Sequence, residues 1–394
     1  MVSCRVWFEP LETAPWALLC ESATLESRVD GTDRLRVAIL IVGFRNPLDV
    51  KACLSALARS SEQPLFDVFV CENGGMEAYG RLCEALLDRD GPCRPRTGER
   101  TESIGPASGR LVELERFSLK GRDTAVWVGS ANQNLGYAGA INVWVERLLP
   151  MLCYNGFWIV NPDAEPDPNA LRALVQRALI GNKGMVGSTI VSANEHGFIT
   201  CRAGHHWRKF RTNLALLGLG EAPTAPVDPA VIEAELDCIS GASMYVTRSC
   251  VEDVGLMDER FFLYYEDADW SARAKKHGLG YAPDSLVTHM GGTTIGSARS
   301  RAQRSRLSVY LESRNHLHFV RMHWPGYLPF ALLFGSMQAL LYLFVRSPQN
   351  ANAAVAGMVA GIRGETGQPQ FNAPSTEAAP RLLGKKSRTA NLPL

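Results

Sequence analysis

The sequence predicts an α/β protein with a doubly wound, mostly parallel central sheet flanked by helices and followed by a C-terminal helical extension. Three segments carry this prediction: the continuous aliphatic run at residues 37–42 (VAILIV), and the buried strands predicted at residues 66–71 (FDVFVC) and 157–160 (FWIV). A continuous aliphatic run is typical of a parallel strand that is covered on both faces. Residues 49–60 have apolar side chains at helical spacing, so the chain begins as strand, helix, strand.

Composition narrows the class of protein. The 394 residues are enough for a sizeable core. With 41 Lys and Arg against 40 Asp and Glu, the net charge of +1 gives no electrostatic case for nucleic acid as a partner. Ten cysteines occur singly, without a CxxC pair or a Cys/His cluster, which favours buried thiols in a reducing compartment. No basic-then-apolar signal peptide opens the chain, so we expect a cytoplasmic protein.

The chain divides into four expected parts. Residues 1–34 lack a clear period and form an N-terminal extension, and residues 35–325 form the α/β domain. Residues 326–364 are an apolar helical region, and residues 365–394 have the composition of a disordered tail. Within the domain, residues 88–123 lack periodicity and indicate a surface insertion or mobile loop.

Polar and small residues follow the predicted strands, where open α/β sheets bind ligands. Val42, Gly43, Phe44 and Arg45 end the first strand, and an Asn-Gly turn follows the second. That turn is equally compatible with a structural role alone. Residues 132–142 (NQNLGYAGAIN) precede a helix, and small residues with free amides there favour a diphosphate. They do not form the dinucleotide fingerprint GxGxxG.

The third strand leads into Asn161-Pro-Asp-Ala-Glu-Pro, in which Asp163 and Glu165 are two residues apart. On a turning backbone both carboxylates can converge on one divalent cation. The alternative is a Pro/Asp turn that opens a helix over residues 168–179. Further along, His289 is a candidate ligand or a core histidine.

Residues 261–270 (FFLYYEDADW) combine five aromatic side chains with three acids. Burial of Glu266, Asp267 and Asp269 is costly unless they have partners or a chemical task. Because a helix is expected over residues 271–277, the alternative is an acidic N-cap cluster on a helix dipole. Small residues around Gly241 are suited to the floor of a pocket.

A basic segment and an apolar segment close the ordered part. Arginines recur over residues 299–306 and are followed by further Arg and His residues up to residue 323. This pattern fits a solvated helix face, or a surface that rests on anionic phospholipid or holds a phosphorylated lipid. Residues 327–345 are short for a membrane span but long enough for a helix in the bilayer interface, with a partly buried helix as the alternative.

In this order, GFRN, CENGG, NLGYAGAIN, NPDAE, SGASMYVTR, FFLYYEDADW and VTHMGG resemble the family 2 glycosyltransferases of the GT-A fold. The resemblance covers about residues 36–325 and is strongest for the rhamnosyltransferase-type subset of cell-surface polysaccharide synthesis. It implies an inverting transfer, with L-rhamnose from dTDP-rhamnose as the expected donor and a divalent metal (Mg or Mn) as cofactor. The implied acceptor is a glycan or a lipid-linked saccharide at the inner face of the cell membrane.

Three alternatives remain open at this point. The donor can be another nucleotide-sugar, such as a UDP-hexose or UDP-galactofuranose, and the same fold can bind a nucleotide-sugar without turnover. A sugar nucleotidyltransferase is disfavoured because no Gly-rich phosphate loop with Lys and Arg follows the first strand.

The resemblance also implies roles for individual residues. Asp267 matches the catalytic base, with Glu266 beside it, and Glu72 stands where the nucleobase-binding acid is usually Asp. The other nucleotide-sugar residues are Val42, Gly43, Phe44, Arg45, Asn73, Asn134, Gly136, Ala138, Gly139, Asn142, Asn161 and Asp163. The implied metal ligands are Asp163, Glu165 and His289. Asp269, Trp270 and Gly241 are assigned to the acceptor side, with Trp270 as a sugar platform or a core residue.

Overall fold

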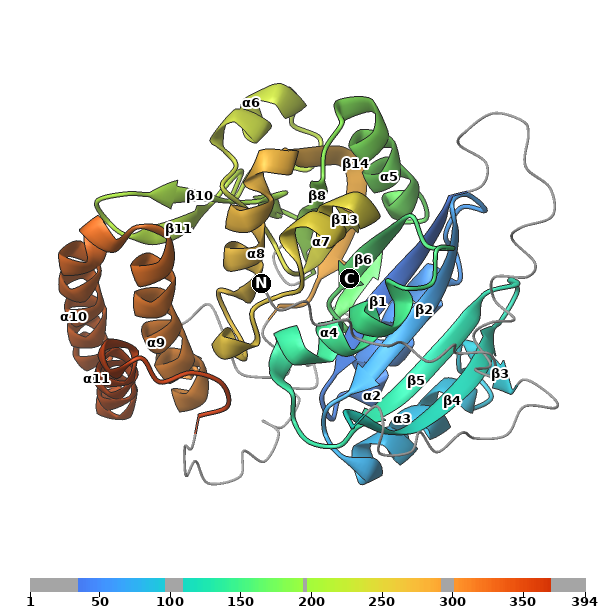
Figure 1. Ribbon diagram of the computed structural model, residues 1–394, viewed down its shortest axis with the longest axis horizontal. Helices are drawn as coiled ribbons and strands as arrows, with labels where there is room; N and C mark the ends of the chain where they lie inside the picture. Colours follow the sequence, from blue (N-terminus) through green and yellow to red (C-terminus); the bar gives the residue numbers. More distant parts are fainter. Residues whose placement is uncertain (1–34, 96–108, 194–196, 292–300, 370–394) are drawn as a thin grey trace, which may run out of the picture.

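The computed structural model describes residues 35–95, 109–193, 197–291 and 301–369. The expected N-terminal extension (1–34) and nearly all of the expected tail (370–394) lie outside these residues, as does Arg299. One large sheet runs through the molecule, with helices on both faces and three further helices at one side (Figure 1). The predicted α/β fold class is confirmed.

The large sheet has eleven strands in the order β3-β4-β5-β2-β1-β6-β13-β8-β14-β7, and β9 pairs with β8. Six strands of its centre run in one direction: β1 (Arg36–Gly43), β2 (Leu65–Glu72), β5 (Ala125–Ala131), β6 (Gly156–Val160), β8 (Met185–Ser192) and β14 (Leu279–His289). Strand β13 (Ser243–Thr247) runs antiparallel between β6 and β8. The three predicted strand segments, 37–42, 66–71 and 157–160, lie in β1, β2 and β6, which are adjacent at the centre of the sheet.

Residues 88–95 and 109–123 depart from the expected irregular loop, and residues 96–108 of that expectation lie outside the described residues. Within them, β3 (Cys93–Pro95) and β4 (Leu111–Leu119) extend one edge of the sheet. A register shift between Leu111 and Glu113 changes the spacing of the buried side chains, which hides the two-residue period of β4 from the sequence. The other peripheral strands are β7 (Ala164–Pro166) and β9 (Ile199–Arg202).

A small second sheet has the order β11-β10-β12. Its strands are β10 (Gly204–Arg208), β11 (Asn213–Leu216) and β12 (Cys238–Ile239). Strand β11 was not evident from the sequence because it is four residues long and only partly buried. This sheet lies between the large sheet and the C-terminal helices (Figure 1).

Successive side chains of the central strands point to opposite faces of the sheet, so a hydrophobic core forms on each face. Leu40 belongs to a cluster with residues of α4 (Gly136–Leu148), α7 (Arg248–Val254) and α8 (Glu266–Ala274). The neighbouring Ile39 points the other way, into a cluster with α2 (Pro47–Leu57), α3 (Met76–Leu87) and α5 (Ala170–Gly181). Helix α6 (Pro229–Glu235) lies at the periphery, and short 3-10 turns occur at Glu259–Phe261, Lys275–His277, Arg301–Gln303 and Pro325–Tyr327. The eight cysteines of the described ranges are all free, and seven are buried.

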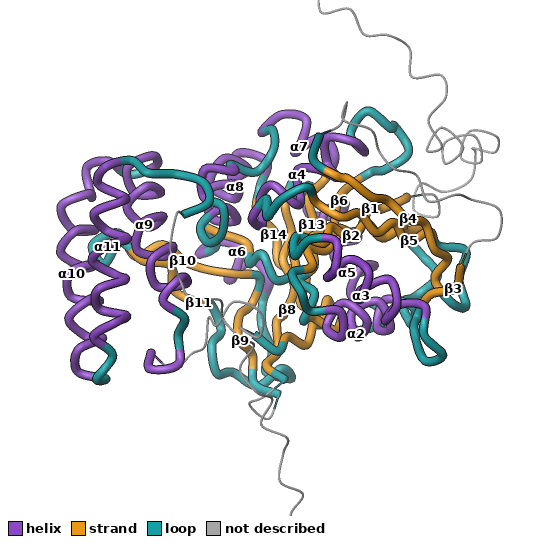
Figure 2. The backbone as a smooth tube through the Cα atoms, turned by 90° about the horizontal axis from the view of Figure 1, so that it is seen from below, coloured by secondary structure: helices purple, strands orange, loops and turns teal. Residues whose placement is uncertain are grey.

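The C-terminal extension is a group of three helices: α9 (Arg306–His323), α10 (Leu328–Phe344) and α11 (Pro348–Arg363) (Figure 2). Helices α9 and α11 pack closely, since a Cβ on Gly357 of α11 would lie 2.2 Å from the carbonyl oxygen of Tyr310. Helix α9 therefore packs against α11, and it also bonds to the α/β domain through Asn315 and His323.

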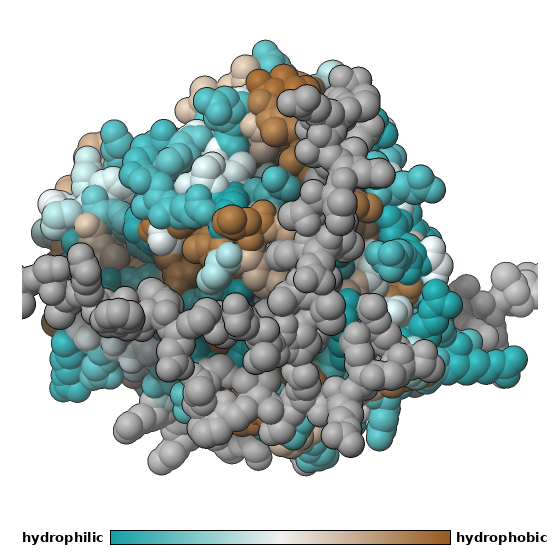
Figure 3. Space-filling model, turned by 45° about the vertical axis from the view of Figure 1, so that its right-hand side comes forward, coloured by the Kyte–Doolittle hydropathy of each residue, from teal (hydrophilic) through white to brown (hydrophobic). Residues whose placement is uncertain are grey.

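Among the described residues, one helical stretch, Pro325–Phe344, has the length and apolar composition to cross a membrane, and 17% of its apolar 18-residue window is buried. Elsewhere the surface has a different character. Figure 3 shows a face of the molecule that is largely hydrophilic, with apolar side chains confined to a few areas.

Candidate functional site

The carboxyl ends of four parallel strands meet at one edge of the sheet. Gly43 at the end of β1 is in register with Glu72 of β2, and Glu72 with Ser130 of β5. On the other side of β1, Ile41 is in register with Val160, the last residue of β6. The four loops that the sequence singled out therefore lie along this edge, as the doubly wound topology requires.

Glu72 is fully buried at this edge, and its two oxygens have different surroundings. Oε1 accepts hydrogen bonds from the backbone N–H of Arg45 (3.0 Å) and of Gly74 (2.7 Å). Oε2 is buried and has no hydrogen-bond partner within the described residues. Burial raises the pKa of Glu72, while the two N–H groups act in the opposite direction. A Cβ at residue 43 would lie 2.7 Å from Oε2, so the longer acid fits because a glycine faces it.

The loop before α4 is held in place by hydrogen bonds from backbone N–H groups and from the side-chain amides of Asn73 and Asn134. Asn73 donates to the carbonyl of Gly136 (2.8 Å) and accepts from the N–H of Leu135 (3.3 Å). Asn134 accepts from the N–H of Gly136 (3.0 Å), and the N–H of Tyr137 donates to the carbonyl of Phe262 (2.7 Å). The backbone N–H groups of Leu135, Gly136 and Tyr137 therefore already have acceptors within the protein. The expectation of free N–H groups for a diphosphate does not hold for these three.

Farther into α4, the expected ligand residues face the protein interior. Ala138 is fully buried. The amide of Asn142 donates to the carbonyl of Met257 (2.9 Å) and accepts from its N–H (3.1 Å). Gly139 lies against Arg110 and Glu259. These contacts join α4 to the segment that leads into the acidic motif, which is a structural task.

The acidic motif follows a backbone held in an uncommon conformation. Phe262, Tyr264 and Tyr265 have φ values of 64°, 71° and 72°, a region that costs non-glycine residues about 1–3 kcal/mol each. The Asn315 amide of α9 donates to the carbonyls of Phe261 (2.8 Å), Leu263 (2.8 Å) and Tyr264 (2.9 Å).

Helix α9 thereby holds the loop before the acids. Its Arg314 guanidinium also reaches the carbonyl of Phe261 (3.1 Å) and is 1% exposed. Asn315, His316 and His318 are buried as well. The expectation of a solvated basic face is therefore wrong for the middle of α9, because Arg314, Asn315 and His316 bond to backbone carbonyls inside the protein. His318 packs against the ring of Phe261.

Helix α8 begins at Glu266, five residues before the predicted helix start. All three acids consequently lie in its first turn, where the positive end of the helix dipole favours negative charge. Asp269 is inside the helix, so the interpretation of this residue as the N-cap is wrong. Tyr265 occupies the N-cap position in the left-handed region.

Glu266 and Asp267 differ in their environment although they are neighbours. Glu266 is buried, its Oε2 has no hydrogen-bond partner within the described ranges, and burial together with the Asp267 charge raises its pKa well above the usual value. Asp267 is half-buried, and its Oδ2 accepts from the N–H of Gly241 (3.1 Å) while Oδ1 accepts from the N–H of Ala268 (2.8 Å). Of the two neighbouring acids, Glu266 is the one whose burial disfavours the charged form.

Asp269 and Trp270 are structural. Asp269 is fully buried, with Oδ2 paired to Arg273 (2.9 Å) and Oδ1 bonded to His323 of α9 (2.9 Å). Trp270 is 1% exposed and donates from Nε1 to the carbonyl of Gly255 (2.9 Å). The expected acceptor-side role is therefore wrong for both residues, because neither offers a free surface. Core packing is the alternative that holds for Trp270.

Two of the three predicted metal ligands are brought together. His289 Nε2 lies 3.0 Å from Asp163 Oδ1 and 3.3 Å from Asn161 Nδ2. The pairing of β14 with β7 sets His289 opposite Ala164 and Thr288 opposite Glu165. Glu165 is exposed, and the described residues contain no group of three or more His, Cys, Asp or Glu side chains that could hold a metal. Asp163 and His289 fit a divalent cation that draws its remaining ligands from a bound diphosphate.

Tyr137 connects these groups, and the sequence analysis gave it no role. Its hydroxyl lies 2.9 Å from the carbonyl oxygen of Gly241 and 3.0 Å from Asn161 Oδ1. Burial and the charges of three acids, Glu266, Asp267 and Asp163, raise its pKa. The acid pair and the proposed metal side therefore face the same tyrosine. Its signal in the sequence was an aromatic residue between two glycines of the 132–142 stretch.

Comparison with known proteins identifies the class. The curated relatives are glycosyltransferases, and the predicted resemblance to such enzymes is confirmed. The low-salt glycan biosynthesis hexosyltransferase Agl10 of Haloferax volcanii is 24% identical over 247 residues, which cover 60% of this chain and 76% of the relative. The N-acetylglucosaminyl-diphospho-decaprenol L-rhamnosyltransferase of Mycobacterium tuberculosis is 29% identical over 245 residues, covering 54% of this chain and 74% of the relative. No family model matches the chain.

Solved structures with a related outline were also found. The mannosyltransferase PcManGT from Pyrobaculum calidifontis, in complex with GDP-Man and Mn²⁺, is 13% identical with a TM-score of 0.43, covering 88% of this chain and 93% of that one. TarS 1-349 of S. aureus, in complex with UDP-GlcNAc, is 10% identical with a TM-score of 0.45, covering 84% and 82%.

Proposed function

We propose that the protein is an inverting, family 2 glycosyltransferase that moves L-rhamnose from dTDP-rhamnose onto a lipid-linked glycan in the synthesis of cell-surface polysaccharide. The observation that carries the proposal is the set of acids around Tyr137. The Tyr137 hydroxyl lies 2.9 Å from the carbonyl oxygen of Gly241, whose N–H donates to Asp267. The same hydroxyl lies 3.0 Å from Asn161, which in turn contacts His289, the partner of Asp163. The rhamnosyltransferase relative supports the choice of sugar.

Asp267 is the proposed base that acts on the acceptor hydroxyl. An acceptor hydroxyl must lose its proton as it attacks the anomeric carbon, and a carboxylate within reach takes it. The N–H of Gly241 fixes Oδ2 of Asp267, and the side chain lies in the first turn of α8, at the positive end of the helix dipole. Oε2 of Glu266, beside it, is buried without a partner among the described residues and is available for a hydrogen bond with substrate.

The donor side is divided between two places on the strand edge. Oε2 of Glu72 offers a buried acceptor for a ligand N–H, and the imide of thymine or uracil has one. Asp163 and His289 would hold Mg²⁺ or Mn²⁺, which supplies positive charge for the departing diphosphate when bound. Glu165 is left out of this set because its side chain is exposed.

A panel of nucleotide-sugars tests the proposal. dTDP-rhamnose, UDP-galactofuranose and UDP-hexoses are incubated with Mn²⁺ or Mg²⁺ and a lipid-linked acceptor, and nucleoside diphosphate release is measured. Acceptor-dependent release from dTDP-rhamnose is the expected result. Release from UDP-sugars alone would change the donor, and binding without any release would favour a nucleotide-sugar-binding protein.

The metal assignment has a matched control within three residues. Asp163→Ala should weaken Mn²⁺-dependent binding of nucleoside diphosphate at least tenfold. A tenfold change in Kd corresponds to the free energy of about one hydrogen bond to a charged group. Glu165→Ala removes an exposed acid nearby and should bind like the parent. Equal binding by both variants would contradict the assignment.

A further inference from the structure

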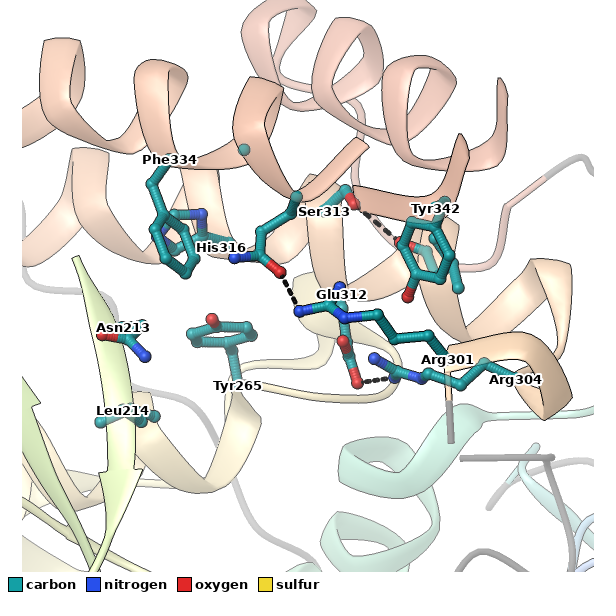
Figure 4. A pocket seen from close by; sticks show the side chains of 13 residues that line it. Asn213, Leu214, Tyr265, Arg301, Arg304, Glu312, Ser313, His316, Phe334 and Tyr342 are labelled. Carbon is teal, nitrogen blue, oxygen red and sulfur yellow. Dashed lines mark hydrogen bonds and ion pairs between the residues drawn. The ribbon is translucent and has the colours of Figure 1, made fainter. Parts of the chain in front are cut away.

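A second site lies in the C-terminal extension, away from the strand edge. It is a pocket of about 440 Å³ between α9, α10 and strand β11 (Figure 4). Tyr265, which precedes the acid pair, lies between Asn213 of β11 and the arginines at the other side of the pocket. None of the residues assigned to the nucleotide-sugar lines it.

The pocket carries an excess of positive charge. Arg301 donates to the side chain of Gln338 (2.6 Å), and Arg304 is paired with Glu312. Burial lowers the pKa of His316 to about 4, so this lining residue is neutral at pH 7. Two guanidinium groups therefore face a single carboxylate in a space that is partly closed from water.

One donor of the lining lacks a partner. The Nε of Arg304 is buried without a hydrogen bond to any described residue. Buried polar groups of a folded protein are normally paired, so this unpaired N–H of Arg304 indicates a ligand that accepts hydrogen bonds. Guanidinium groups bind phosphate oxygens with several parallel N–H bonds.

An apolar surface adjoins the pocket on helix α10. Leu333, Met337, Leu340 and Phe344 are 70%, 47%, 57% and 82% exposed and follow one another at helical spacing. Phe334, Gln338 and Tyr342, which lie one or two positions from the stripe residues on the same helix, line the pocket. An exposed apolar stripe therefore runs beside the cationic pocket, along a helix with the composition of a membrane segment.

The pocket is also close to the acid pair. Tyr265 lines it, and Asp267 follows two residues later. Burial raises the pKa of the Tyr265 hydroxyl, and the charges of Glu312 in the pocket and of Asp267 both add to this effect. One aromatic ring thus lies within reach of the pocket and of the proposed base.

We propose that this pocket binds the phosphate-bearing end of the lipid-linked acceptor. The phosphate oxygens bond to Arg301 and Arg304, the lipid chain follows the apolar stripe of α10, and the sugar extends past Tyr265 toward Asp267. A lipid diphosphate matches the three features because it joins an apolar chain, an anion and a saccharide in that order. This inference rests on the proposed transfer reaction for its choice of ligand.

Binding of farnesyl diphosphate to the full chain in mild detergent tests the pocket without donor sugar or turnover. We expect Arg301→Gln to raise its Kd at least tenfold. Arg346→Gln, which removes an exposed arginine just beyond α10 and outside the pocket, should leave the Kd within twofold of the parent. Farnesol and inorganic pyrophosphate should each bind at least tenfold more weakly than farnesyl diphosphate, since each lacks one half of the ligand.

Several results would overturn the inference. An unchanged Kd in Arg301→Gln excludes the pocket, and an equal loss in Arg346→Gln indicates diffuse surface charge instead. Competition by phosphatidylglycerol vesicles as strong as that by farnesyl diphosphate makes the site a general anionic-membrane contact. Arg304→Gln, checked for folding by circular dichroism, is a second variant with the same expected loss. Because these measurements need no nucleotide-sugar, failure of the donor panel and failure of the pocket are separate outcomes.

Discussion

The hydrogen bonds between α9 and the loop before the acids allow the stability loss of one substitution to be calculated. Asn315→Ala removes the amide that donates to the carbonyls of Phe261, Leu263 and Tyr264. The carbonyl of Phe261 keeps its bond from Arg314, so two carbonyls lose this donor. Each partly buried carbonyl that loses its partner costs about 1–2 kcal/mol, and the expected loss of unfolding free energy is about 2–4 kcal/mol.

Urea unfolding followed by tryptophan fluorescence measures this loss. Ser336→Ala is the control, because Ser336 bonds only to the carbonyl of Leu332 in its own helix and is exposed; it should change the free energy of unfolding by less than about 0.5 kcal/mol. The loop should also lose its fixed conformation, so turnover should fall more than nucleotide affinity. A loss below about 0.5 kcal/mol in Asn315→Ala would refute the reasoning that α9 holds this loop.

Three further substitutions test single groups of the site. The pKa of Glu266 is raised, so between the ordinary glutamate pKa and the raised one the folded protein binds more protons than the unfolded chain. The free energy of unfolding should therefore fall as pH rises through this window. Glu266→Gln should abolish that fall in urea titrations at several pH values, and an unchanged slope would contradict the prediction. Tyr137→Phe should lower kcat about 5–10-fold by removing one hydrogen bond near the acids, and an unaffected kcat would leave Tyr137 without a role. Glu72→Gln should raise the Kd of a pyrimidine nucleotide about tenfold. Its carbonyl must accept from Arg45 and Gly74, which turns the NH₂ toward the ligand; equal affinity would argue against a base contact.

The sequence predicted the centre of the fold well because its signal there is local. Residues 37–42 are apolar at every position, and the strand β1 that they form is covered on both faces. Strand β4 was missed because a register shift breaks its alternation. Strand β11 was missed because four partly buried residues carry too little pattern.

For the site, the sequence indicated which residues gather but not which atoms are already bonded. The pairing of Asp163 with His289 joins residues 126 positions apart, and spacing alone could only suggest it. Asp269 and Trp270 resemble functional residues by type, yet their contacts with His323 and Gly255 belong to tertiary packing. The burial of Arg314 likewise depends on carbonyls more than 50 residues away.

The acid pair of α8 is the centre of the proposed mechanism, and Asp267→Asn tests it most directly. The substitution keeps an oxygen for the N–H of Gly241 but removes the proton acceptor. The measurement compares acceptor-dependent release of nucleoside diphosphate with the Kd of the nucleotide, in the variant and in the parent. We predict a loss of transfer of at least about 10³-fold with a Kd within about twofold of the parent. Normal turnover by Asp267→Asn would contradict the assignment of the base and with it the proposed reaction.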